Sequence, residues 1–143
     1  MTFRVRDAQP ADEPAIARVA ESAIATLRAT YRPSAGMIAR AADRRRLRRL
    51  VAIDADDSLV GTLAHDNGHV VGLFVHTDHR RRGVARQLLD AIDGRASLYT
   101  IRETGNVLVF ERLGFRIVRE QPAVDYVAVA DEHATLTEVY MER

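Results

Sequence analysis

The chain has 143 residues, of which 47% are hydrophobic and 29% charged, enough for one domain with a hydrophobic core and too few for two. It contains no cysteine, which excludes disulfides, thiolate metal sites and a cysteine nucleophile. All 21 basic residues are arginine and the formal net charge is only +1. This balance argues against a dedicated nucleic-acid-binding protein, because such domains are usually strongly basic.

No apolar run reaches the roughly 20 residues that span a bilayer. The N-terminal stretch MTFRVRDAQPADE also lacks the apolar segment of a signal peptide. We therefore expect a cytoplasmic protein with no membrane partner. No repeat or Pro/Gly/Ser-rich linker interrupts the chain, so residues 1–143 are expected to form a single domain.

The N-terminal part predicts one strand and two helices. Residues 3–8 alternate as a short strand does. Asp12 is expected to cap a helix that has Pro14 in its first turn. The buried face of this helix follows from apolar residues at 3.6-residue spacing: Ile16, Val19, Ala20, Ala23, Ile24 and Leu27. A second helix is expected to begin at Pro33, carry Met37, Ile38 and Ala41, and continue into the arginine-rich segment 43–49.

The pattern changes to strands after Leu50. Three strand-like runs at 50–54, 58–65 and 69–75 are separated by turn residues and predict an antiparallel meander. The elements expected after it are a helix at 83–92, a strand at 97–101, a helix at 106–115 closed by Gly114, and strands at 115–120, 124–130 and 136–141. This order predicts an α/β fold of the α+β type. It would have one central mixed, mostly antiparallel sheet flanked by about four helices.

The junction between residues 75 and 85 has the form of an anion-binding site. A strand ends at Val75, a short polar loop follows, and three arginines precede Gly83 and the next helix. The first amides of a helix lack intrahelical acceptors, and the helix dipole adds partial positive charge there. Gly83 lets the backbone come close to a bulky anion, and Ala85 keeps the first turn uncrowded.

The stretch LFVHTDHRRRGVARQLL resembles motif A of the GCN5-related N-acetyltransferase superfamily. The signature of that motif, Gln/Arg-x-x-Gly-x-Gly/Ala, is represented by Arg80, Gly83 and Ala85. The later stretch ETGNVLVFERLGF is similar to motif B, with Asn106 and the pair 114–115 in the expected places. The resemblance covers the whole chain.

This resemblance implies acetyl-CoA as the co-substrate and no metal. The backbone N–H of Val75 would polarise the thioester carbonyl, and the side chains of Phe74 and Val75 would belong to the core. Asn106 would contact the pantetheine arm, although an asparagine there could equally cap its helix. The cofactor-binding residues implied are Phe74, Val75, Arg80, Arg81, Arg82, Gly83, Val84, Ala85, Arg86, Asn106 and Phe110.

Phe110 departs from the family pattern. The superfamily usually has a tyrosine there as the general acid for the leaving thiolate, and phenylalanine has no proton to donate. A positioned acid is worth about 10²–10⁴-fold in rate, yet thiols with pKa values near 8.5 leave without one. Tyr99, Tyr126, Tyr140 or water are the alternative acids.

The resemblance places the general base at positions 69–71, where only His69 titrates near neutral pH. The alternative is that His69 merely flanks a hairpin turn. Further candidates are His76, His65 and Glu103.

The arginine-rich segment 43–49 has two interpretations. Most segments of this kind form a solvated helix face, here with Asp43 in ion pairs. In the superfamily this region often walls the acceptor site, where arginines would favour an acceptor carrying carboxylate or phosphate.

The function expected is direct transfer of the acetyl group from acetyl-CoA to the amine of a small-molecule acceptor, by a monomer or homodimer. One alternative is a non-catalytic acyl-CoA-binding sensor of the same fold, favoured by Phe110. Another is a nucleic-acid-binding module based on the arginine clusters, which the low net charge and sparse aromatic residues oppose. No nucleic-acid partner is therefore expected.

Overall fold

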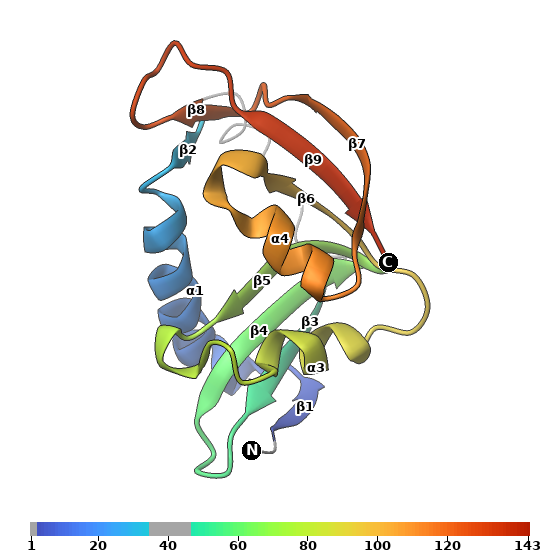
Figure 1. Ribbon diagram of the computed structural model, residues 1–143. Helices are drawn as coiled ribbons and strands as arrows, with labels where there is room; N and C mark the ends of the chain where they lie inside the picture. The colour runs from blue at the N-terminus through green and yellow to red at the C-terminus, as the bar shows by residue number, and fades with distance from the viewer. Residues whose placement is uncertain (1–2, 35–46) are drawn as a thin grey trace. The chain divides into compact units, whose positions relative to one another are not determined.

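The computed structural model describes residues 3–34 and 47–143 (Figure 1). The helices and strands are β1 (Arg4–Asp7), α1 (Glu13–Leu27), β2 (Tyr31–Pro33), β3 (Arg48–Ile53), β4 (Leu59–Asp66), β5 (His69–Val75), α3 (Val84–Asp90), β6 (Ser97–Ile101), α4 (Asn106–Arg112), β7 (Arg116–Pro122), β8 (Tyr126–Ala128) and β9 (Thr137–Glu142). Short 3₁₀ turns lie at Pro10–Asp12, Thr77–His79 and Arg102–Thr104. This is a mixed α/β fold whose strands pair mostly antiparallel, as expected.

The chain groups into two compact units. Among the described residues, the N-terminal unit comprises residues 3–24 and 47–96, and the C-terminal unit comprises residues 25–34 and 97–143. The described residues contain three α-helices. Most of the second helix expected from the sequence falls on residues 35–46, outside the described residues. The expectation of a single domain stays a prediction.

The N-terminal unit is built on four antiparallel strands in the order β1-β3-β4-β5. The meander predicted for residues 50–75 is confirmed, although β3 begins at Arg48, within the expected helix. Arg48 and Arg49 are therefore strand residues, and their guanidinium groups pair with Asp7 and Glu13. Local sequence patterns could not predict these two ion pairs, because both acidic partners lie far from the arginines along the chain.

Helices α1 and α3 cover opposite faces of this sheet. Ile16 of α1 packs against Val51 and Ile53 of β3. Helix α3 lies over β3 and β4 (Figure 1), where Gly61 faces it. Gly61 pairs with Ala52, so both residues face α3. Because successive strand residues point to opposite faces, Val51 and Ile53 on either side of Ala52 face α1, and the two helices cover opposite faces.

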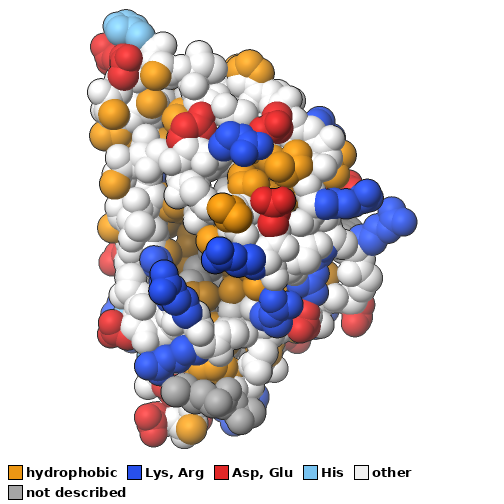
Figure 2. Space-filling model, in the orientation of Figure 1, with side chains coloured by type: hydrophobic (Ala, Val, Ile, Leu, Met, Phe, Trp, Pro, Cys, Tyr) orange, Lys and Arg blue, Asp and Glu red, His pale blue; other side chains and the backbone are white. Residues whose placement is uncertain are grey.

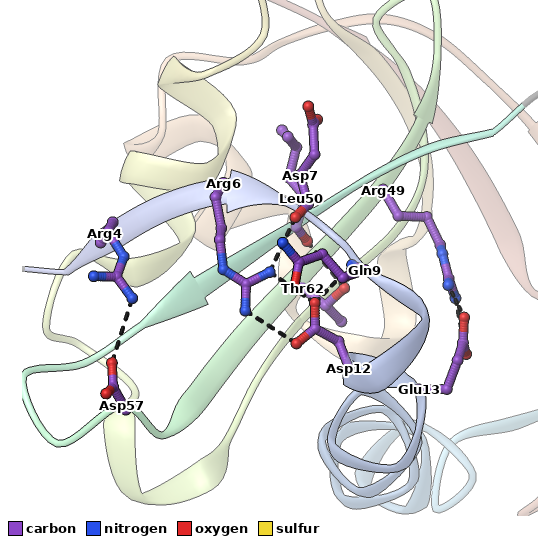
Figure 3. A network of polar contacts seen from close by, with 10 residues as sticks. All are labelled: Arg4, Arg6, Asp7, Gln9, Asp12, Glu13, Arg49, Leu50, Asp57 and Thr62. Carbon is purple, nitrogen blue, oxygen red and sulfur yellow. Dashed lines mark hydrogen bonds and ion pairs between the residues drawn. The ribbon is translucent and has the colours of Figure 1, made fainter.

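The start of α1 differs from the expectation (Figure 3). Asp12 does not cap α1 as its first flanking residue; it ends the 3₁₀ turn Pro10–Asp12, and α1 follows directly. Its carboxylate accepts the backbone N–H of Gln9 at 2.7 Å and two guanidinium bonds from Arg6 at 2.7 and 3.0 Å. These bonds, the two from Arg6 above all, lower the pKa of Asp12 to about 2.

The C-terminal unit contains strands β6-β9-β7 and a separate two-stranded sheet, β2-β8. Pro33, where the second helix was expected to begin, is the last residue of strand β2, so the expected helix start is wrong. The expected central, mostly antiparallel sheet is confirmed, except that β8 lies outside it and pairs with β2. Around this small sheet lies a core cluster consisting of Ile101, Ala123, Ala128 and Leu136 with Tyr31 and Tyr126.

The C-terminal end of α4 confirms the role predicted for Gly114. This residue has φ 97°, and its N–H donates to the carbonyl of Glu111 at 3.0 Å. The N–H of Phe115 donates to the carbonyl of Phe110, also at 3.0 Å. The two bonds form a Schellman motif. Within the described part of the chain, no helix is both long and apolar enough to cross a bilayer.

Candidate functional site

The loop between β5 and α3 is tied to the sheet through His76. The N–H of His76 donates to the carbonyl of Val60 in β4 at 2.8 Å, and the carbonyl of His76 accepts the N–H of His79 at 2.9 Å. The imidazole Nδ1 of His76 accepts the N–H of Asp78 at 3.2 Å. One residue thus connects β4, the end of β5 and the turn Thr77–His79.

Two left-handed residues then lead into α3. Arg81 has φ 64°, and Gly83, which immediately precedes the helix, has φ 83° and ψ 9°. A non-glycine residue in this region is strained, and such strain concentrates at functional sites. No heavy atom lies within 4 Å of the place where a Cβ on Gly83 would be. The side of Gly83 on which a side chain would lie is therefore open, immediately before α3.

The close packing of α3 against β4 depends on Gly61. A Cβ on Gly61 would lie 2.7 Å from Cγ1 of Val84 and 3.2 Å from Cδ1 of Leu88. The absence of a side chain lets the helix approach β4 closely. Val84 is only 1% exposed, so its side chain belongs to the contact with β4 and is not available to a ligand. An isolated glycine within a strand pattern is the sequence signal for such a contact, and Gly61 is not among the residues predicted for the site.

The charge of this region comes from the arginines at 80–82 and Arg86, all of which are exposed. Asp78 is exposed beside them, and the face in Figure 2 carries arginine and acidic side chains together. Such mixed charge does not resemble the continuous basic surface of a nucleic-acid-binding domain. No group of three His, Cys, Asp or Glu side chains suited to a metal occurs among residues 3–34 and 47–143.

The backbone of Val75 is oriented away from β4. The N–H of His76 bonds to Val60 of β4, and successive N–H groups of a strand point to opposite edges. The N–H of Val75 therefore points to the other edge of β5. Phe74, paired with Thr62, lies next to it.

The candidate bases occupy different environments. His69 begins β5 opposite Asp66, at the turn between β4 and β5. The six residue steps from His69 to Val75 correspond to about 20 Å of strand. Glu103 accepts the backbone N–H of Thr137 at 2.7 Å, which gives its carboxylate a structural role.

His65 is buried, and its Nδ1 accepts the N–H of Gly68 at 3.0 Å. Because Nδ1 accepts, the proton of the neutral ring lies on Nε2, a buried atom with no partner among the described residues. Burial, with a smaller contribution from Arg48, lowers the pKa of His65. A buried ring of this kind is poorly suited to take a proton from a substrate.

The motif B residues lie in the C-terminal unit. Helix α4 is preceded by Gly105, with φ 82° and ψ 0°. Asn106 is the first helical residue, so the alternative that it caps α4 is wrong. Phe110 is half-buried, with its ring edge-on to Phe115 at a centroid distance of 5.8 Å.

The tyrosines considered as alternative acids have partners of their own. The hydroxyl of Tyr99 accepts a bond from Arg119 at 2.9 Å, and the same guanidinium lies 4.2 Å from the ring centre of Tyr140. Burial, together with smaller charge effects from Tyr31 and the nearby acidic residues, raises the pKa of Tyr126 to about 12. Each of these tyrosines belongs to the C-terminal unit.

A strand ending at an ordered loop, followed by left-handed residues, arginines and a helix start, defines a candidate phosphate-binding site. Residues 23–131 match the acetyltransferase (GNAT) domain family, and the chain belongs to this family. The resemblance noted in the sequence is thereby confirmed. No curated protein matches the chain.

Solved acetyltransferases have a similar fold over nearly the whole chain. A GCN5-related N-acetyltransferase from Rhodopseudomonas palustris is 18% identical, with a TM-score of 0.71 and coverage of 100% of this chain and 96% of that one. Nourseothricin acetyltransferase is 19% identical, with a TM-score of 0.65 and coverage of 99% and 98%. A phosphinothricin acetyltransferase from Sinorhizobium meliloti, solved with acetyl-CoA, is 20% identical, with a TM-score of 0.64 and coverage of 100% and 88%.

Proposed function

We propose that this protein is an N-acetyltransferase that moves the acetyl group of acetyl-CoA directly to the amine of a small-molecule acceptor. Family membership supports acetyl transfer. The observation that carries the co-substrate assignment is the open space beside Gly83, which follows the exposed arginines in the chain and immediately precedes α3. Such space suits a bulky anion, which the backbone amides of a helix start attract.

In this proposal the residues from Arg80 to Arg86 hold the pyrophosphate of the co-substrate. The backbone amides at 83–85 supply most of the binding, and the guanidinium groups add charge. Acetyl-CoA supplies an activated thioester. An amine nitrogen bonds to the acetyl carbon, the carbon–sulfur bond breaks, and the ammonium proton passes to solvent or a base.

The N–H of Val75 is proposed to stabilise the negative charge that develops on the acetyl oxygen. Its direction away from β4 supports this role, because an N–H already used in the β4–β5 ladder could not serve. One donor of this kind contributes roughly 10²–10³-fold in other enzymes.

Phe110 implies that the thiolate leaves without protonation from that position. The rate would then be limited by deprotonation of the amine and would rise with pH without a descending limb. Phe110→Tyr tests this: if the pocket holds the hydroxyl, kcat should rise, and a descending limb should appear near the usual tyrosine pKa of about 10. A wild-type profile that already falls at high pH would instead assign the acid to another group.

His69 remains the proposed base, although its position at the start of β5 places it far from Val75. About 20 Å separates it from Val75, so a proton would have to travel through ordered water. His69→Gln should shift the ascending limb of the kcat/KM profile if this relay exists. An unchanged profile would assign deprotonation to solvent.

The described part of the arginine-rich segment gives little support to an anionic acceptor. Arg48 and Arg49 are paired with Asp7 and Glu13, and residues 43–46 lie outside the described residues. A small amine that carries neither a carboxylate nor a phosphate group is therefore the first acceptor class to test.

The decisive experiment measures thiol release from acetyl-CoA across a panel of small amines, beside the shift of Tm caused by acetyl-CoA alone. Turnover with at least one amine and a raised Tm are the expected results. A raised Tm without turnover would favour the non-catalytic acyl-CoA sensor, which the lack of an acid at Phe110 makes the second candidate. No Tm shift and no turnover would overturn both.

A further inference from the structure

His76 makes three hydrogen bonds that organise the loop before α3. Two of them, to Val60 and from His79, use backbone atoms and would survive any substitution with an N–H. The third, from the N–H of Asp78 to Nδ1 at 3.2 Å, requires an acceptor on the side chain. Only this bond depends on the identity of residue 76.

The side-chain bond closes the turn Thr77–His79 against the end of β5. With it, two consecutive amides, those of Asp78 and His79, both point back to His76. The turn leads within two residues to Arg81, whose φ of 64° is an unfavourable conformation for arginine. A conformation of this kind persists only when the surrounding structure holds it in place.

We propose that His76 is a positioning residue for acetyl-CoA binding. Its imidazole holds the turn 77–79, and the turn directs Arg81 and Gly83 into the left-handed conformations that precede α3. This inference rests on the proposed function. The His76 side chain is 37% exposed and that of Asp78 is 82% exposed, so water competes for the bond and its contribution is that of one ordinary hydrogen bond.

Two substitutions separate the acceptor from the ring. His76→Asn removes the ring but keeps an acceptor oxygen at the same distance from the backbone, because asparagine readily bonds to the amide two residues ahead. His76→Phe keeps a ring of similar size and removes the acceptor. Thr77→Ala is the matched control, since it truncates an exposed side chain in the same turn.

Amide hydrogen exchange of the ligand-free protein tests the structural half of the proposal. His76→Phe should accelerate exchange at the N–H of Asp78 by about 5-fold, as expected for the loss of one modest hydrogen bond. His76→Asn and Thr77→Ala should leave it near the wild-type rate. Equal exchange in the Phe and Asn variants would overturn the proposal, whatever the ligand.

Steady-state kinetics test the functional half at one fixed pH, after the Tm of each variant has shown that it is folded. His76→Phe should raise KM for acetyl-CoA about 5-fold and leave kcat within 2-fold, and His76→Asn should restore KM. A lower kcat with unchanged KM, or equal KM values in all variants, would overturn the role of His76 while the proposed function stands. A wild-type protein that neither binds nor turns over acetyl-CoA would overturn the proposed function, and the positioning role with it.

Discussion

Helices α3 and α4 begin with nearly the same backbone conformation. Gly83 has φ 83° and ψ 9°, and Gly105 has φ 82° and ψ 0°. Each helix has seven residues. Neither glycine has a heavy atom within 4 Å of its would-be Cβ position. By backbone geometry alone, both would be equally good anion sites.

Their surroundings differ. At α4, the N–H of Asn106 donates to the Thr104 hydroxyl at 3.2 Å, and that hydroxyl donates to the carbonyl of Ile101 at 2.6 Å. The acidic Glu103 also stands before α4. At α3, the preceding residues are three exposed arginines, one of them left-handed. A glycine at a helix start permits an anion site; nearby charge favours the proposed one at α3, and the amide partner and acidic residue oppose one at α4.

The largest expected effect separates the two glycines. Gly83→Val and Gly105→Val each force a branched residue into a left-handed conformation, at a cost of about 1–2 kcal/mol in unfolding free energy. Only Gly83→Val should abolish the rise in Tm caused by acetyl-CoA, which is about 5–10 °C at 100-fold excess over Kd. Thermal unfolding with and without acetyl-CoA measures this difference. Full stabilisation of Gly83→Val would mean that the site lies elsewhere.

A second pair of variants tests the close packing of α3 against β4. Gly61→Ala puts a methyl group 2.7 Å from Val84, so the helix must shift, and we expect a loss of about 1–3 kcal/mol in unfolding free energy. Acetyl-CoA affinity should fall about 10-fold, because a shift of about 1 Å misaligns a binding constellation. Gly94→Ala is the control, since its φ of 81° also costs unfolding free energy while the added methyl group has open space around it. Equal affinities in both variants, measured by calorimetry, would refute the dependence on Gly61.

The arginine side chains should matter less than the backbone. Arg81→Gly and Arg81→Ala each remove one charge, so both should weaken acetyl-CoA binding only a few-fold. Arg81→Gly should in addition gain about 1 kcal/mol in unfolding free energy over Arg81→Ala, because glycine accepts φ 64° without strain. Replacing Arg80, Arg81 and Arg82 together should weaken binding further and reduce its salt dependence. Unchanged affinity in the triple variant would show that the arginines are only solvated.

The smallest effect on acetyl-CoA binding is expected from a substitution at His65. This residue instead affects how unfolding free energy depends on pH. Its pKa is lowered by burial, so the unfolded state binds a proton more readily, and unfolding free energy falls as pH drops below about 6.5. Above that pH, His65 stays neutral in both states and its contribution is constant. His65→Gln should flatten the dependence between pH 8 and pH 5 in denaturant titrations and leave acetyl-CoA affinity at pH 8 unchanged. If unfolding free energy falls equally steeply with decreasing pH in the variant, groups other than His65 cause the loss of stability in acid.

Short-range patterns in the sequence predicted most of the elements. The meander at residues 50–75 follows from apolar residues and turn chemistry between neighbouring positions. The end of α4 follows from Gly114, because a Schellman motif involves only the last turn of a helix. The candidate site at residues 80–86 could likewise be predicted, since a strand, an arginine run, a glycine and a helix start are contiguous in the chain.

Tertiary structure alone decided the features that join distant residues. Tyr31 pairs with Ala128 in β2-β8, and no local pattern in residues 31–33 specifies a partner almost a hundred positions away. The same holds for the pairing of Arg49 with Glu13, which accompanies a strand where a helix was expected. The left-handed conformation of Arg81 is also invisible in the sequence, because arginine does not favour it and the surrounding loop must impose it. Local composition determines which conformations are available to each segment, and contacts between distant segments select among them.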